Sequence, residues 1–331
     1  MNEFLDAVEF FTKTVDNLKK GIVTVHSSLE EIVLKASANE MAYIDNRRDA
    51  KGKFGHDFWG SLNRNWLKTQ GINKKLLYSK SEQFPDFLFK VRKNQGGLTR
   101  GSLLELKDSK GGSIASFNST LPTKRKSLEE VDVVNNKKLV SKIARITDGD
   151  LAQTEEYYNY ERNCFYLVRT HKNDNRAKIS IVDGSFFETV PKDHLIYQMF
   201  LNVLRGHLEK REIEIPPETL RQVEEALSHV TDQTIIAASQ VIEKASVRPR
   251  LRIMAEVHSE GNPHSSFYPQ ISDGSFNLIL QASPNASALR RDLPQEIPEV
   301  EAFSIYHKRN GEHIVFQFPA MSRNISLGKY L

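Results

Sequence analysis

The spacing of apolar residues near the start of the chain is typical of amphipathic helices. Within residues 2–20 the apolar side chains recur every three or four positions and charged side chains occupy the opposite face, which predicts a helix. Ser28 and Glu31 have the spacing of a capping box, so we expect a second helix to begin there and to run to about Ile44. Further helical patterns cover residues 56–70, 137–160, 191–209, 217–229 and 231–246.

Short apolar runs bounded by turn residues predict β-strands. Residues 84–91 form an aromatic and apolar run, and residues 101–108 alternate apolar with charged side chains, as a strand with two different faces does. Residues 109–136 are polar, and we expect them to be mostly loop. Further strands are expected at residues 163–171, 177–183, 251–257, 276–280 and 313–318.

The length of the chain suits about two domains. A chain of 331 residues is more than one average domain requires. The Pro216-Pro217 pair is a candidate joint, because the composition changes there. We therefore expect one domain over residues 1–210, and a second domain or large appendage of helices and strands over residues 211–331.

Composition excludes several classes of protein. The chain is 39% hydrophobic and 27% charged, which is ordinary for a globular protein. It has no run of the roughly 18 apolar residues that a membrane span needs. Its start is acidic where a secretory signal would be basic. The one cysteine, Cys164, excludes a disulfide framework. We expect a soluble cytoplasmic protein that does not contact a membrane.

The net charge of +4 does not identify a nucleic-acid-binding protein, so the placement of the charges matters more. Eight lysines and arginines and three acids lie between Lys110 and Arg145, and residues 123–126 are the densest basic run. A solvated surface is the commoner explanation of such a run until its neighbours in the sequence are considered.

The most informative segment begins with Pro85-Asp86 and continues, after 18 residues, with Glu105-Leu106-Lys107. In a strand Glu105 and Lys107 project to the same side, and a neighbouring strand could bring Asp86 beside Glu105. Two carboxylates and the Leu106 carbonyl would form a cluster of hard oxygen ligands, which Mg²⁺ prefers. Lys107 could then contact an attacking water and a phosphate oxygen. The alternative is a surface strand with Glu105 and Lys107 on its solvent-exposed face.

These residues resemble the motif of the PD-(D/E)xK nuclease superfamily, and within it type II restriction endonucleases. The tract that follows, residues 108–122, is similar to the stretch after the motif in some restriction enzymes. The resemblance covers roughly residues 25–210. It implies an α/β fold with a restriction-endonuclease-like mixed central sheet flanked by helices. It also implies that Asp86 and Glu105 bind Mg²⁺, and that Lys107 orients the water that attacks a DNA phosphodiester bond.

Some family members add an acid from an upstream helix, and Glu40 is the candidate here, with Glu31 as a weaker one. The tract after the motif supplies short polar side chains and basic side chains that suit phosphates and base edges. A polar surface loop is the alternative. The expected DNA-binding residues are Lys110, Ser116, Asn118, Ser119, Thr120, Lys124, Arg125 and Lys126.

The resemblance predicts a type II site-specific deoxyribonuclease that makes double-strand breaks and belongs to a restriction–modification system. Its partners would be double-stranded DNA, a second copy of the chain and a separate cognate DNA methyltransferase. Residues 211–331 would serve DNA recognition or dimerisation. The helix at residues 2–20 could form the dimer contact or pack on its own core. The alternatives are a repair or mobile-element nuclease and a non-catalytic DNA-binding protein.

Overall fold

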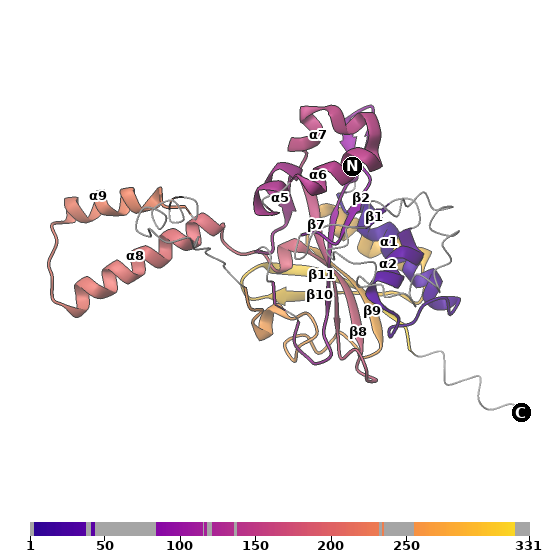
Figure 1. Cartoon of the computed structure of the whole chain (residues 1–331). Helices are drawn as coiled ribbons and strands as arrows, with labels where there is room; N and C mark the ends of the chain where they lie inside the picture. The colour runs from indigo at the N-terminus through magenta and orange to yellow at the C-terminus, as the bar shows by residue number, and fades with distance from the viewer. Residues whose placement is uncertain are drawn as a thin grey trace, which may run out of the picture. The chain divides into compact units, whose positions relative to one another are not determined.

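The computed structural model describes residues 3–37, 41–43, 84–114, 116–117, 121–135, 138–231, 234 and 255–321. The chain divides into two compact units, which are described separately (Figure 1). The first unit contains residues 1–188 and 255–331, and the second contains residues 189–254. The second unit is therefore inserted within the sequence of the first.

A mixed sheet of nine strands forms the centre of the first unit. Strand β5 pairs in parallel with β7, and β8 pairs in parallel with β9, while the other neighbours are antiparallel. A short strand, β6 (Arg125–Lys126), pairs with β7 beside this order. The order across the sheet is β1 (Met41–Tyr43), β2 (Phe87–Phe89), β5 (Leu103–Asp108), β7 (Arg162–Thr170), β8 (Lys178–Asp183), β9 (Ser275–Gln281), β11 (Gly311–Pro319) and β10 (Glu301–His307). A separate hairpin joins β3 (Arg92–Asn94) to β4 (Gly97–Thr99).

Helices cover both faces of this sheet, which confirms the expected α/β class and the mixed central sheet flanked by helices (Figure 1). On one face, α1 (Leu5–Lys19), α2 (Leu29–Ser37) and α11 (Pro284–Glu296) contribute to one buried core, to which β5 contributes Leu104 and Leu106. The other face is covered by α5 (Leu128–Asn135), α6 (Leu139–Asp148), α7 (Glu155–Asn159) and the loop that contains Tyr268. Short 3-10 turns occur at Gly149–Gln153, Gly184–Phe186 and Ser259–Gly261.

Helix α1 packs on its own sheet, which is the second of the two fates considered for the helix at residues 2–20. Phe11 is fully buried and its ring stacks on Phe276 of β9, with ring centroids 5.3 Å apart. Burying one such side chain contributes about 1.5–3 kcal/mol. The apolar face of α1 is buried in the core, so it is not available for a dimer contact.

The second helix begins as expected and ends earlier than expected. Glu31 donates its backbone N–H to Ser28 Oγ at 3.1 Å, as a helix N-cap requires. However, α2 ends at Ser37, and Met41–Tyr43 form an edge strand paired with β2. The prediction that the helix reaches Ile44 was wrong, because pairing with the sheet overrides the helical pattern there. The helices expected at residues 56–70 and at most of residues 231–246 lie outside the described residues.

Two further findings concern the polar stretches. Residues 109–136 are mostly loop where they are described, as expected, but they also contain α5, which begins at Leu128. Ser127 and Glu130 each bond the other's backbone N–H at its start, which is a capping box. Between the expected strands at 276–280 and 313–318, the structure has α11 and the strand β10, neither of which the sequence pattern predicted. The strand expected at residues 251–257 lies partly outside the described residues, and its described part forms only an isolated bridge, between Ala255 and Phe117. The remaining predictions for the described residues correspond to β2, β5, β7, β8, β9, β11, α1, α6, α7, α8 and α9.

The expected boundary at residues 210 and 211 does not coincide with the observed units. Strands β9, β10 and β11 all follow that boundary in sequence, yet they belong to the central sheet. The reason is the parallel pairing of β8 with β9, which joins segments on either side of the insertion. Residues 211–331 are therefore not one separate region of the fold.

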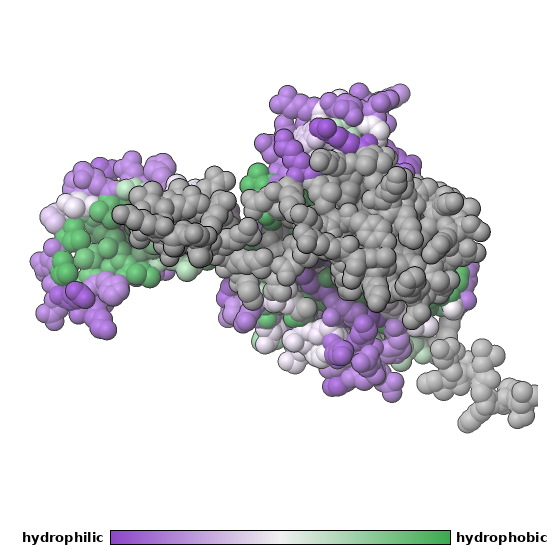
Figure 2. Space-filling model, in the orientation of Figure 1, coloured by the Kyte–Doolittle hydropathy of each residue, from purple (hydrophilic) through white to green (hydrophobic). Residues whose placement is uncertain are grey.

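The second unit contains two packed helices, α8 (Lys192–Lys210) and α9 (Pro217–Ser228). An ion pair between Arg205 and Glu224 joins them. This unit shows an apolar surface in Figure 2, and Met199 and Val203 of α8 are both 59% exposed. Within the described part of the chain, no helix is both long and apolar enough to cross a membrane.

Candidate active site

Strands β2 and β5 bring the two motif carboxylates together. Their antiparallel register sets Phe87 opposite Leu104 and Leu88 opposite Leu103. Continued by one residue, this register brings Asp86 opposite Glu105. Leu88 and Leu103 face the α5–α7 side of the sheet, so Asp86 and Glu105, each two residues away, face the same side. Asp86 therefore lies beside the part of β5 that carries Glu105.

The local sequence explains why the pairing of β2 with β5 does not extend beyond Asp86. Pro85 has no backbone N–H and cannot extend the ladder of hydrogen bonds. Asp86 Oδ2 instead accepts the backbone N–H of Leu106 at 2.9 Å. The Asp86 side chain thus satisfies a buried donor on β5 and is fixed against the strand that carries Glu105.

Lys107 completes the group on the same face. Its Nζ lies 3.0 Å from Glu105 Oε1, and the two side chains are only 11% and 9% exposed. The alternative, in which Glu105 and Lys107 lie on the solvent-exposed face of a surface strand, does not hold, because Glu105 is buried. A carboxylate in such a place requires a compensating positive charge, and Lys107 supplies it.

The donor set suits a hard divalent cation. Asp86, Glu105 and the Leu106 carbonyl offer oxygen ligands only, which Mg²⁺ accepts together with water and phosphate oxygens. Within the described ranges, no group of three or more His, Cys, Asp and Glu side chains could hold a metal ion. The two carboxylates would therefore rely on the carbonyl and on water or phosphate for the remaining positions. The expected extra acid, Glu40, lies outside the described residues.

Asp108, the next acid along β5, points to the opposite face and has a structural role. Arg169 forms two hydrogen bonds to its carboxylate, at 2.9 and 2.6 Å, and Lys172 adds a third at 2.8 Å. Burial would raise the pKa of Asp108, but these bonds outweigh burial and hold that pKa below its ordinary value. Asp108 and Lys110 have the same spacing as Glu105 and Lys107. They do not form a second site, because Arg169 and Lys172 occupy the Asp108 carboxylate.

The structure does not bring the basic run beside the two carboxylates. Strand β6, with Arg125 and Lys126, pairs with the beginning of β7. Lys124 Nζ contacts Gln281 of β9 at 2.6 Å, so it lies on the far side of β7 from β5. Arg125 bonds Asn163 and Glu3, each at 3.1 Å. Sequence proximity to the motif did not predict this separation, because it arises from strand pairing.

Of the other expected DNA-binding residues, two are at least partly exposed and three lie outside the described residues. Lys110 is exposed just beyond the end of β5, and Ser116 is partly exposed. Asn118, Ser119 and Thr120 lie outside the described residues.

Sequence reasoning missed Phe117, which contacts the candidate site directly. The Lys107 ammonium lies 5.0 Å from the centroid of the Phe117 ring, within the range of a cation–π contact. Phe117 is only 3% exposed although polar residues surround it in sequence. An isolated aromatic residue in a polar tract was the available signal, because such a side chain is usually buried.

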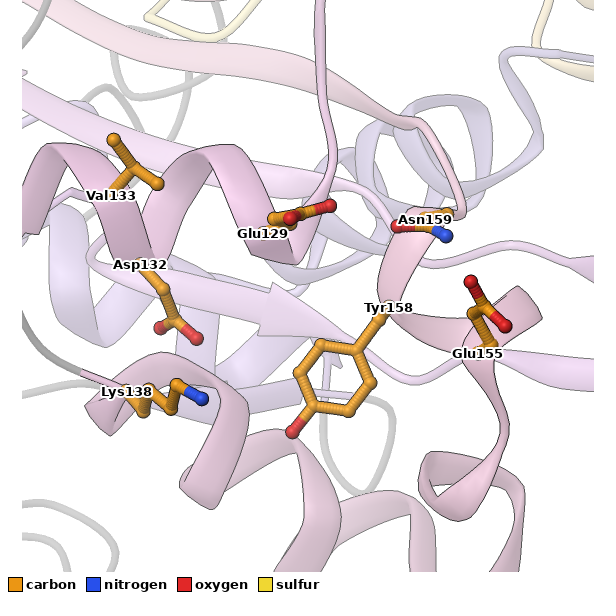
Figure 3. A pocket seen from close by; sticks show the side chains of 7 residues that line it. All are labelled: Glu129, Asp132, Val133, Lys138, Glu155, Tyr158 and Asn159. Carbon is orange, nitrogen blue, oxygen red and sulfur yellow. The ribbon is translucent and has the colours of Figure 1, made fainter.

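A separate cleft lies between α5, α6 and α7 (Figure 3). It has a volume of about 740 Å³, and its lining includes Asp132, Lys138 and Tyr158. Burial raises the pKa of Asp132, although a hydrogen bond from Ser141 opposes this. None of Asp86, Glu105 and Lys107 lines this cleft, so it is not part of the candidate site.

Comparison with known proteins gives no relative. No protein-family model, no curated protein and no solved structure matches the chain. The residues of the site are therefore the basis for a functional assignment.

Proposed function

We propose that this chain is a Mg²⁺-dependent deoxyribonuclease that hydrolyses phosphodiester bonds of double-stranded DNA. Within that class we propose a type II restriction endonuclease with a restriction-endonuclease-like fold, acting as a homodimer beside a separate methyltransferase. One observation carries the proposal. Asp86 accepts the backbone N–H of Leu106, the residue between Glu105 and Lys107 on β5, and Lys107 contacts Glu105, whose side chain is buried.

Each of the three side chains has a chemical role in this proposal. Asp86 and Glu105, with the Leu106 carbonyl, hold the cation. When bound, Mg²⁺ lowers the pKa of a water and neutralises charge that develops on the phosphate. The Lys107 ammonium lies beside Glu105, where it would orient the water and contact a phosphate oxygen. Asp86 is held by the Leu106 N–H, so its carboxylate is positioned before substrate arrives.

The basic residues provide affinity that does not depend on base sequence. Lys110 is exposed at the end of β5, near the candidate site in sequence, and is the most direct candidate for a phosphate contact. Lys124 and Arg125 have partners within the protein, and they would exchange those partners to bind phosphate. We therefore assign Lys110 a larger share of the binding than residues 124–126.

A plasmid-cleavage assay tests the proposal. Purified protein is incubated with supercoiled plasmid in Mg²⁺, and a parallel reaction contains EDTA. Discrete fragments that disappear with EDTA support a restriction enzyme. Nicks or a smear support a repair or mobile-element nuclease. Retardation of the plasmid without cleavage in Mg²⁺ would show a non-catalytic DNA-binding protein and refute the nuclease.

A further inference from the structure

Phe117 joins two parts of the chain that are far apart in sequence. Its backbone exchanges two hydrogen bonds with Ala255: the N–H of Phe117 donates to Ala255 O at 3.0 Å, and the N–H of Ala255 donates to Phe117 O at 3.2 Å. Its ring packs edge-on against Tyr166, with ring centroids 5.3 Å apart, and at a tilt against Phe187, with ring centroids 5.5 Å apart. The ring is thus held by both its backbone and its neighbours.

Two of these neighbours are the junctions of the helical unit, residues 189–254. The sheet unit ends at Glu188 before that insertion and resumes at Ala255 after it. Phe187 therefore immediately precedes Glu188, the last residue before the insertion. Ala255 is the first residue after the insertion. Both junctions contact Phe117. A displacement of either junction would reach the Phe117 ring through a direct contact.

On its other side the same ring contacts Lys107, whose ammonium lies 5.0 Å from the ring centroid. The face of an aromatic ring attracts a cation through its electron density. It also has no oxygen atom that would compete with the Asp86 and Glu105 carboxylates for a divalent cation. An aromatic ring can therefore hold the ammonium in place without altering the ligands of the proposed metal site.

We propose that Phe117 is a positioning residue, which holds the Lys107 ammonium for catalysis and makes this hold depend on both junctions of the helical unit. The inference rests on the proposed nuclease function. It adds a route by which the helical unit controls the rate of the chemical step. Phe117 acts through Lys107 and does not itself touch the substrate.

The first experiment changes the electron density of the ring and leaves its shape nearly constant. Monofluoro-, difluoro- and trifluorophenylalanine are incorporated at position 117, and cleavage is measured under single-turnover conditions with saturating protein. The rate should fall stepwise with fluorination, by about tenfold at the last step. The melting temperature and the binding of duplex DNA in EDTA should stay unchanged.

The matched control is the same series at Phe318, a buried ring of β11 that has a cation–π contact of its own, with the Lys19 ammonium 5.9 Å from its centroid. Its cleavage rate should not change with fluorination. A rate that is constant across the position 117 series, or that falls equally in both series, would overturn the positioning role.

The second experiment tests the connection to the junction with a double-mutant cycle. Ala255→Pro removes the N–H that donates to Phe117 O. It should slow cleavage several-fold in the otherwise wild-type protein and have no further effect in Phe117→Leu. Equal slowing in both backgrounds would mean that Ala255 does not act through Phe117. The melting temperatures of all four proteins confirm that they are folded.

The two proposals fail in different ways. If wild-type protein does not cleave DNA with Mg²⁺, the proposed function is wrong and this inference falls with it. If wild-type protein cleaves and the fluorinated series shows no trend, only the role of Phe117 is wrong.

Discussion

At the scale of single residues, the three motif side chains are predicted to be essential for cleavage. Asp86→Asn, Glu105→Gln and Lys107→Met keep the approximate size of each side chain and remove its charge. Each should lower the cleavage rate by at least about a hundredfold, because a lost electrostatic contact to the reacting phosphate costs about 3 kcal/mol. Single-turnover cleavage in Mg²⁺ measures this.

Duplex binding in EDTA distinguishes loss of catalysis from loss of folding in these variants. Binding should persist, and removal of a carboxylate near the phosphates should strengthen it. Asp292→Asn, at an exposed acid on α11, is the control and should cleave at the wild-type rate. A motif variant that cleaves at nearly the wild-type rate would remove that residue from the site.

A buried histidine far from the motif predicts how stability depends on pH. His313 is fully buried, and its ring nitrogens lie 3.2 Å from Ser185 Oγ and 3.2 Å from Gly311 O. Burial lowers the pKa of His313 to about 4, whereas an unfolded histidine has a pKa of about 6.5. Between these values the unfolded chain binds a proton that the folded chain does not. His313 therefore stabilises the fold above pH 6.5, and this contribution is lost as the pH falls toward 4.

The expected loss from His313 between pH 7 and pH 5 is about 2 kcal/mol in the free energy of unfolding. His313→Gln has no such group, so its free energy of unfolding should fall by that much less over the same interval. Urea denaturation of both proteins at the two pH values measures the difference. Equal pH dependence in the two proteins would show that His313 is protonated in the folded state.

At the scale of elements, α1 is anchored to the beginning of the strand that carries the candidate site. The buried Asp6 carboxylate accepts three hydrogen bonds, from the backbone N–H groups of Gly101 and Ser102 and from Ser102 Oγ. Asp6→Ala leaves these donors without their acceptor, and it should lower the free energy of unfolding by about 3 kcal/mol. Asp16→Ala, at an exposed acid on the same helix, should change it by less than about 0.5 kcal/mol. Urea denaturation of both variants tests this, and equal losses would refute the anchoring role of Asp6.

The elements also show what the sequence could predict. Strand β5 and the shared face of Glu105 and Lys107 follow from alternation, and α1 follows from its apolar spacing, because both patterns are local. Helix α11 was predictable as well, since Ser283 caps its start and Pro284 is its first residue, but the polar composition concealed it. Strand β10 was harder to predict, because its exposure does not alternate regularly and it is held by pairing with β11.

The candidate site was predictable in part for the same reason. The alternation of β5 places Glu105 and Lys107, but the partner of β5 is a long-range fact that only the pairing with β2 decides. The contact between Lys107 and Phe117 and the distance of Lys124 from β5 likewise depend on tertiary packing. Local sequence therefore predicted the shared face of Glu105 and Lys107 better than it predicted which residues surround them.

At the scale of the whole molecule, the insertion changes how the chain should be dissected. A truncation near Pro216 would remove β9, β10 and β11, and with them core residues such as Phe276 and Phe316. Such a truncation cannot separate catalysis from recognition, because it removes part of the central sheet. The helical unit, residues 189–254, supplies none of the described strands of the central sheet, so it can be altered without removing one of them.

The last prediction concerns the number of chains that cut one DNA site. Each chain contributes one group of Asp86, Glu105 and Lys107 on β2 and β5. Cleavage of both strands at fixed positions is simplest when two copies bind a palindrome, since the two-fold axis of the protein then coincides with that of the DNA. A contact between two copies would not use the apolar face of α1, because that face is buried against β9.

Mixing wild-type protein with Lys107→Ala protein tests this arrangement. If the copies exchange before DNA is added, a dimer with one disabled site cuts one strand only. Nicked circles should therefore accumulate, with the largest fraction at equal amounts of the two proteins. Independent monomers would instead make linear product more slowly, without a persistent nicked species. Sedimentation with a cognate duplex provides the second measurement, and one chain per duplex during double-strand cleavage would refute the dimer.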